Sequence, residues 1–449
     1  MLAWTVFAFG GVYPGTLVVP ATICILLALA YRPSLVARSP TRRADFWSLL
    51  VAGAMLLQMI PLPRVLLHTI DPAAEAVART MFLVDGGGPL PISIDYASTA
   101  GALLLFASLL LFFATARDIL AQGGVRTVTR IIAVIGLVLS AIAIAQSATG
   151  HGLMYWHWKP ASEGPEPFGP FVNRNHFGTW GIMAIPLLAG YLTAHAAAHY
   201  GPDSRAAWRE RVVAAIDTRA WMLIASTTTL IVALALSLSR SALLGLAGAL
   251  GCGALLAMQG PPAPHDRRYA PRSGRAGALI AVLAALAVLG VATQVGPGAI
   301  ARRFGGSGTA MADRLAIWHD TLPVLRDFWP TGTGAGTYLT SMAVYQRSKP
   351  GVIFNQAHNH YLQVAAEGGV LLALPVFLAL AAFTRSAADR LRNDRSGIYW
   401  IRAGAAAGLV GVAVQSVWET GLTIPANAAL AAVLAAIVIS VPARAGAQS

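Results

Sequence analysis

A few polar residues interrupt a chain that is otherwise strongly apolar, and their chemistry is the first feature to explain. Residues 357–370 read AHNHYLQVAAEGGV and continue directly into apolar sequence. Histidine changes its protonation near neutral pH, which makes His358 a candidate proton acceptor, or general base. The alternative is a structural histidine at a membrane surface.

The two histidines of this stretch are not expected to do the same job. On a helix, His360, Gln363 and Glu367 share one face, whereas His358 points about 160° away from that face. Asn359, between the two histidines, is a further polar candidate.

Arg240 is the most unusual cation in the sequence. It lies in LALSLSRSALLGL, residues 234–246, between two apolar runs with no other charge nearby. An arginine at membrane depth typically costs at least about 2.5 kcal/mol unless it is paired or hydrated. Arg240 is therefore either a residue that reaches the surface from a tight outer turn, or an anion ligand facing an aqueous cavity.

Two further arginines also have two interpretations each. Arg174, in PFGPFVNRNHFGTW, lies among asparagines that could simply cap a helix. Arg314 could pair with Asp313 or Asp320 on a surface helix, or it could bind a ligand.

Arg174, Arg240, Arg314 and His358 belong to four separate predicted elements, and the predicted topology brings all four to one membrane surface. Arginine presents planar pairs of donors that match phosphate oxygens. The convergence predicts a site for a lipid-linked phosphate or diphosphate. A reaction that expels a diphosphate would need this charge neutralisation most in its transition state.

Membrane-spanning helices must position these residues. The 449 residues are 56% hydrophobic and 11% charged, against roughly 25% charged residues in soluble domains. We predict an all-α, polytopic integral membrane protein with about eleven, possibly twelve, spans. The first run lacks a basic leading region and is too long for a signal peptide, so it is expected to stay in the mature protein. The predicted spans lie near 5–30, 46–62, 98–116, 129–148, 172–195, 220–238, 241–258, 277–295, 359–383, 400–418 and 424–441.

Basic residues concentrate in alternate loops, which are therefore predicted to be cytoplasmic. The opposite loops, which face the periplasm, are 63–97, 149–171, the link near 239, and 296–357. The longest of these is expected to hold an amphipathic surface helix over 311–330 and a glycine-rich turn over 331–339.

The predicted domain organisation follows from this topology. Residues 1–170 would form N-terminal spans, 171–295 central spans that carry the arginines, 296–357 the large periplasmic loop, and 358–449 the C-terminal spans.

Several chemistries are disfavoured. The two lysines, Lys159 and Lys349, do not follow a glycine, so the phosphate-binding loop of nucleotide-driven enzymes is absent from the sequence. No Asp-x-Asp pair occurs as a seat for a divalent metal. We expect neither metal nor cofactor. The net charge of +13 lies in short loops, where anionic lipid and topology explain it better than nucleic acid.

The segments HNHYLQVAAEGG, DRLAIW, PTGTGAGTY, SLSRSALLG and FVNRNHFG together resemble the O-antigen ligase and polymerase superfamily of bacterial polytopic membrane glycosyltransferases. The resemblance spans roughly 170–375. His358, Asn359 and Gly369 fit the ligase spacing, whereas Leu372 stands where a small residue or tyrosine is expected. The departure favours the wider superfamily over a true ligase.

The resemblance implies metal-independent, inverting transfer of a glycan from undecaprenyl diphosphate to an acceptor hydroxyl at the periplasmic face of the inner membrane. Family acceptors are lipid A core, the growing polysaccharide, and serine or threonine of proteins. By resemblance, His358 is the catalytic histidine and Arg240 and Arg314 bind the diphosphate. Asn359 and Arg174 would position donor or acceptor.

The rival hypothesis is a transporter or flippase for lipid-linked glycans, or a non-catalytic partner in a polysaccharide assembly complex. A transporter is expected to carry polar or broken spans on both sides of the midplane. In this sequence the unusual residues gather on one face.

Overall fold

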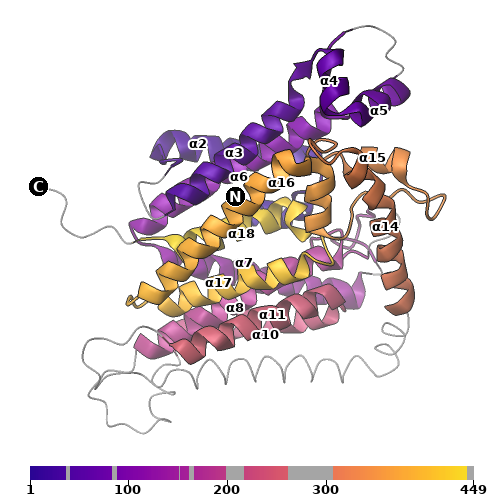
Figure 1. Cartoon of the computed structure of the whole chain (residues 1–449). Helices are drawn as coiled ribbons and strands as arrows, with labels where there is room; N and C mark the ends of the chain where they lie inside the picture. Colours follow the sequence, from indigo (N-terminus) through magenta and orange to yellow (C-terminus); the bar gives the residue numbers. More distant parts are fainter. Residues whose placement is uncertain are drawn as a thin grey trace, which may run out of the picture.

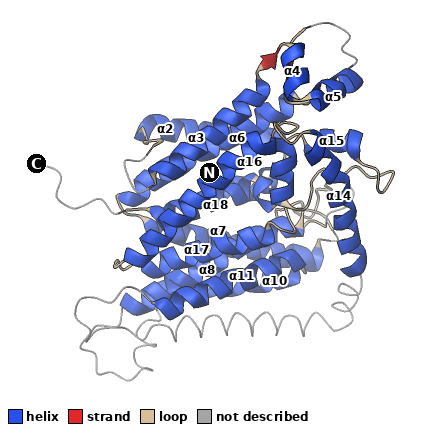
Figure 2. Cartoon of the chain, viewed as in Figure 1, coloured by secondary structure: helices blue, strands red, loops and turns tan. Residues whose placement is uncertain are grey.

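The computed structural model describes residues 1–36, 41–82, 88–150, 152–160, 166–198, 217–260 and 307–441. Its regular structure is mostly helical (Figure 2), with a short antiparallel pair formed by β1 (Pro61–Leu62) and β2 (Leu90–Pro91). The predicted helical class is confirmed. The helices are α1 (Leu2–Phe7), α2 (Val18–Tyr31), α3 (Arg42–Met59), α4 (Arg64–Ile70), α5 (Pro72–Phe82), α6 (Tyr96–Ala121), α7 (Val125–Thr149), α8 (Arg174–Ala198), α10 (Thr218–Leu236), α11 (Arg240–Gln259), α14 (Ser307–Asp327), α15 (Tyr338–Tyr345), α16 (His360–Asn393), α17 (Tyr399–Gln415) and α18 (Pro425–Ile439).

Six helices in the described part of the chain are long and apolar enough to cross a membrane, namely α6, α7, α8, α10, α11 and α16. Every predicted run falls on helical structure except 277–295, which lies outside the described residues. These findings indicate an integral membrane protein. The total of about eleven crossings stays a prediction.

The first predicted span is not one continuous helix. It is divided into α1, two short 3-10 turns over Phe9–Gly11 and Pro14–Leu17, and α2. α1 ends at Phe7. Gly10 and Gly11, in the turn that follows, have φ of 72° and 82°, and their backbone lies close to Phe171 and Pro425.

The core of the bundle is the contact between α8 and α17. A Cβ on Gly404 would lie 2.2 Å from the Pro186 carbonyl oxygen, and one on Gly190 would lie 2.2 Å from the Trp400 carbonyl oxygen. The two backbones therefore touch, as small residues allow between membrane helices. This contact holds the start of α8 and the end of α17 in a fixed relation, and both ends carry site residues.

Two arginines within the helices are buried. Arg402 is fully buried in α17, where it pairs with Asp394 and donates to the carbonyl oxygens of Val438 (2.9 Å) and Ser440 (2.8 Å). Arg117, at the end of α6, pairs with Asp45 at 2.7 Å. Buried charges need such partners, so these two cations join helices rather than face water.

α14 and α15 lie at one end of the long helices, beside α4 and α5 (Figure 1). These four short or peripheral helices share a hydrophobic cluster that includes Leu67, Val77, Phe328 and Met342. α14 covers most of the surface helix predicted over 311–330. Whether this end faces the periplasm stays a prediction, and residues 296–306 lie outside the described residues.

α16 is broken at Gly369, whose φ of 52° and ψ of −157° are not helical. The glycine-rich turn enters the break. Val370 N donates to Trp329 O (2.9 Å), Leu371 N to Pro330 O (3.0 Å), and Gly334 N to Glu367 O (2.9 Å). The predicted ninth span is therefore two helical segments joined through this junction, a form tolerated where the freed backbone groups find partners in protein.

The junction predicts the effect of a single methyl group at Gly332. Its φ is +71°, and an added Cβ would lie 2.3 Å from Glu367 O, whereas Gly351 has φ +96° with open space around it. Left-handed backbone costs alanine about 1 to 2 kcal/mol at either position, and overpacking adds about 1 to 3 kcal/mol at Gly332. Gly332→Ala should therefore lower the thermal midpoint in detergent clearly more than Gly351→Ala. Equal midpoints for the two variants would contradict the close contact.

Candidate active site

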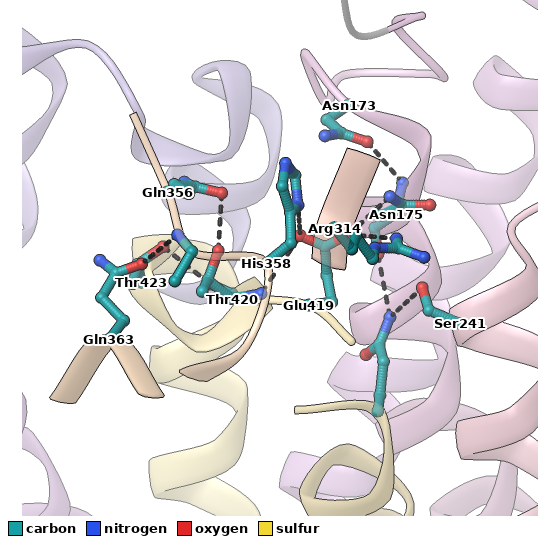
Figure 3. A network of polar contacts seen from close by, with 12 residues as sticks. Asn173, Asn175, Ser241, Arg314, Gln356, His358, Gln363, Glu419, Thr420 and Thr423 are labelled. Carbon is teal, nitrogen blue, oxygen red and sulfur yellow. Dashed lines mark hydrogen bonds and ion pairs between the residues drawn. The ribbon is translucent and has the colours of Figure 1, made fainter. Parts of the chain in front are cut away.

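His358 lies against a buried carboxylate. Its Nδ1 is 3.3 Å from Oε1 of Glu419, which sits in the connection between α17 and α18 (Figure 3). Glu419 is fully buried, while 31% of the His358 side chain is exposed. The pair therefore has one inaccessible partner and one that a ligand can reach.

The local backbone explains where the His358 ring points. His358 has φ of 48° and is followed by Asn359, the N-cap of α16, whose side chain accepts a hydrogen bond from Leu362 N at 3.0 Å. His358 is thus outside the helix. Ala357, just before it, is held by Trp318 Nε1 (3.0 Å) and Gln363 Oε1 (3.1 Å).

Glu419 collects partners from several elements. Asn175 Nδ2 donates to its Oε2 at 2.5 Å, Thr420 N donates to its Oε1 at 3.1 Å, and Arg314 Nη2 lies 4.0 Å from Oε2. A buried carboxylate without such partners would be strongly unfavourable. The carboxylate therefore determines how α8, α14 and the residues before α16 meet.

Asn175 connects this centre to the start of α11. Its Oδ1 accepts from Ser239 Oγ at 2.7 Å, and its carbonyl oxygen lies 3.4 Å from Gln415 Nε2. Ser239 also caps α11 by accepting from Ala242 N. Arg240 is the next residue, so this cap places the guanidinium at the edge of the same centre.

The charges of the centre do not balance. Burial lowers the pKa of Arg314, the Glu419 carboxylate raises it, and the nearby charge of Arg240 lowers it, with a net decrease. Among the described residues, Arg240 has no carboxylate partner within 4.0 Å, and Arg314 has only Glu419. The centre thus holds two neighbouring arginines and one carboxylate, which contacts Arg314, and this leaves positive charge to attract an anion.

Glu419 remains ionised in this setting. Burial alone would raise its pKa, but the hydrogen bond from His358 and the charges of His358 and His176 lower the pKa to about 2. The carboxylate can therefore accept a hydrogen bond from a protonated Nδ1 of His358 throughout the neutral range.

The structure places the five predicted site residues in three settings. His358 and Arg314 meet at Glu419, and Arg240 lies near Arg314. Asn359 caps α16, and its amide oxygen is used there. Arg174 pairs with Glu166 and lines a neighbouring pocket.

The alternative partners foreseen for Arg314 are engaged elsewhere. Asp313 pairs with Lys349, and Asp320 accepts from Arg347 N (3.0 Å) and Ser348 N (2.8 Å). Arg314 instead points toward Glu419 (Figure 3).

The other polar face of α16 has a different task, as its spacing predicted. Glu367 accepts from Gly336 N (2.8 Å), Tyr338 N (3.2 Å) and Gln363 Nε2 (3.0 Å). This face holds the glycine-rich turn and the start of α15. His358, which precedes the N-cap Asn359, contacts Glu419 instead.

Sequence reasoning missed Glu419 and did not single out Asn175. Glu419 is the one acidic residue between 399 and 441, in a stretch that is mostly apolar. Its isolation could have identified Glu419 from the sequence, since a lone carboxylate between two predicted spans requires a partner. Within the described residues, no group of three or more histidine, cysteine or acidic side chains is placed to hold a metal ion.

The fold and the site define a class: a helical membrane protein with a histidine, two arginines and a buried carboxylate at one end of its helices. Residues 225–377 match the family model described as O-antigen ligase. No curated protein matches the chain. The matched segment agrees with the resemblance predicted from the sequence, and it includes Arg240, Arg314 and His358. Asn175 and Glu419 lie outside that segment.

Glu419→Gln tests the buried carboxylate through stability. The change removes the charge that lies against Arg314 and His358, and removing one partner of a buried pair typically costs about 3 to 5 kcal/mol. The pKa of Glu419 is lowered from 4.5 to about 2. Its contribution is therefore complete above pH 4.5 and is lost as pH falls toward 2.

The measurement is the thermal midpoint of purified wild type and variant between pH 3 and pH 8. The two should differ by a constant amount above pH 5 and converge in acid. Asp389→Asn, at an exposed position of α16, is the control and should change stability by less than about 0.5 kcal/mol. A variant as stable as wild type at pH 7 would refute the role given to Glu419.

Proposed function

We propose that this chain is a membrane glycosyltransferase of the O-antigen ligase or polymerase type. It moves a glycan from an undecaprenyl-diphosphate carrier to an acceptor hydroxyl, either on lipid A core or on a growing polysaccharide. The observation that carries the proposal is the meeting of His358 with Glu419, beside Arg314 and Arg240. The family match over 225–377 supports the reaction class.

His358 acts as the general base. With Nδ1 directed at Glu419, that nitrogen holds the proton, and the opposite nitrogen, Nε2, carries the free lone pair. This tautomer is inferred from the hydrogen-bond geometry. Nε2 takes the proton from the acceptor hydroxyl, and the Glu419 carboxylate stabilises the resulting imidazolium.

The bond changes are those of an inverting displacement. The acceptor oxygen forms a bond to the anomeric carbon, and the bond from that carbon to the diphosphate oxygen breaks. The electron pair of the broken bond leaves with the diphosphate. Arg240 and Arg314 neutralise this growing charge, which is worth most in the transition state. Asn175 and Ser239 are positioning residues that hold Glu419 and the start of α11.

The location follows the same reasoning. The described helices include six candidate spans, and the proposal places the protein in the bacterial inner membrane with this site at the periplasmic face. The lipid carrier then presents its diphosphate at the membrane surface, where Arg240 begins α11 and Arg314 lies in the first half of α14.

His358→Ala should lower product formation by about 10²- to 10⁴-fold, the usual contribution of general acid–base catalysis. The measurement is a glycan profile of surface and lipid-carrier fractions, in cells with wild type, deletion or variant at equal protein level. Long glycan retained on the carrier would identify a ligase, and single repeats in place of long chains would identify a polymerase. A normal profile in His358→Ala cells, with an altered profile in the deletion, would instead favour a transport or scaffold role.

Arg240→Lys is a sharper test because it keeps the charge and removes the planar pair of donors. We expect transfer to fall by about 10²-fold or more, as when one donor to a developing oxyanion is removed. The matched control is Arg326→Lys on α14, where the side chain is 80% exposed and pairs with Asp327. Full activity in Arg240→Lys would show that Arg240 contributes only its positive charge and not its planar pair of donors.

A further inference from the structure

A second recess lies beside the His358–Glu419 centre. It is a pocket of about 550 Å³ between the end of α7, the loops before α8, the start of α8 and the turn between α10 and α11. Polar and apolar side chains line it together, among them Gln146, Ser147, Leu153, Glu166, Arg174 and Leu238. Its size suits a ligand of a few sugar units.

The pocket and the centre share a wall. Arg174 lines the pocket, and its neighbour Asn175 binds Glu419 on the other side. Leu238 lines the pocket, and its neighbour Ser239 donates to Asn175 at 2.7 Å. The Asn175–Ser239 hydrogen bond therefore joins the two sides of this shared wall. A ligand that fills the pocket would be separated from Glu419 by this wall.

The two sides of this wall differ in charge. Arg314 has Glu419 as its partner and the neighbouring Arg240 has no carboxylate within 4.0 Å among the described residues, whereas Arg174 pairs with Glu166. Arg174 N also donates to the Glu166 carbonyl oxygen at 3.0 Å. A second diphosphate would have to compete with the Glu166 carboxylate. An uncharged hydroxyl group does not compete, because it can accept from the guanidinium and donate to the carboxylate at once.

The pocket walls are held in place before any ligand arrives. Gln146 Oε1 accepts from Tyr155 N (2.9 Å), and Gln146 Nε2 donates to Gly169 O (3.1 Å), so one side chain ties both loops to α7. The Arg174 side chain is 26% exposed and that of Glu166 is 64% exposed. Both are therefore open to a ligand that enters from solvent, and pre-formed walls reduce the cost of binding it.

We propose that this pocket is a glycan-binding subsite, in which Arg174 and Glu166 bind the hydroxyl groups of an uncharged sugar. The inference rests on the proposed function, because it assigns the subsite to the glycan that is to be transferred or extended. The bound sugars lie against the Asn175–Ser239 wall, and the next unit reaches over that wall to His358 and the arginines. Donor and acceptor both carry hydroxyl-rich glycans, and the test separates them.

The test measures ligand binding to His358→Ala protein in nanodiscs, so that turnover does not interfere. Three probes are used: undecaprenyl diphosphate without sugar, glycan released from the carrier of the deletion strain, and the intact lipid-linked glycan. Arg174→Ala removes the guanidinium, and Ser147→Trp fills the pocket from an exposed position of α7 without changing any charge. Ala145→Trp, also exposed on α7 but outside the pocket lining, is the control.

Free glycan should bind at least about tenfold more weakly to Arg174→Ala, because hydrogen bonds to a charged group are lost. It should bind at least about tenfold more weakly to Ser147→Trp as well, because the indole fills the pocket. Undecaprenyl diphosphate should bind to these variants and to the control as before. If the intact lipid-linked glycan also weakens, the subsite holds the donor's sugars. If it does not, the subsite holds the acceptor.

The proposal is overturned if free glycan fails to bind, if both pocket variants bind it normally, or if they weaken undecaprenyl diphosphate equally. Arg240→Ala tests the underlying function separately. It should weaken undecaprenyl diphosphate and leave free glycan unaffected. If Arg240→Ala leaves undecaprenyl diphosphate binding unchanged, the proposed transferase chemistry fails, whatever the pocket variants show.

Discussion

One fully buried carboxylate organises this end of the protein. Glu419 sits in the short connection between α17 and α18, where water cannot reach it, so its charge must be satisfied by protein groups. The partners come from α8, α14 and the residues before α16. None of these segments is adjacent in sequence, and the need to satisfy one charge brings them together. This arrangement also holds in place His358 and the two arginines, which are the side chains available to bind a ligand.

The rest of the fold serves this arrangement through close backbone contacts. α8 and α17 touch at Gly190 and Gly404, which sets Asn175 against the end of α17. At the other side, the glycine-rich turn fills the break in α16, and Glu367 holds the start of α15. α14 is thereby fixed beside α16, and it presents Arg314 to the centre while Trp318 holds the residue before His358. Glycines allow the helix backbones to approach closely, and this approach brings the polar side chains of the centre within contact of one another.

The sequence allowed the helical class, most helix positions and three residues of the centre to be predicted. His358, Arg240 and Arg314 were recognisable because a polar residue beside an apolar run is costly and needs a reason. Asn175 and Glu419 were not, because their importance depends on a contact between elements far apart in sequence. Arg174 was assigned with the other arginines, since spacing could not reveal that Glu166 neutralises it. The break at Gly369 was missed because two glycines in an apolar run resemble ordinary helix packing.

The boundary of the family segment has a consequence for how such chains can be recombined. Residues 225–377 contain the histidine and both arginines, but the carboxylate and the amide that hold them belong to α8 and to the connection after α17. An exchange of this segment between two related chains would move the reactive groups without their counter-charge. Its success would depend on whether the recipient supplies an acidic residue and an amide at the matching places. The residues that must be exchanged together to keep this centre intact therefore extend beyond 225–377 and include Asn175 and Glu419.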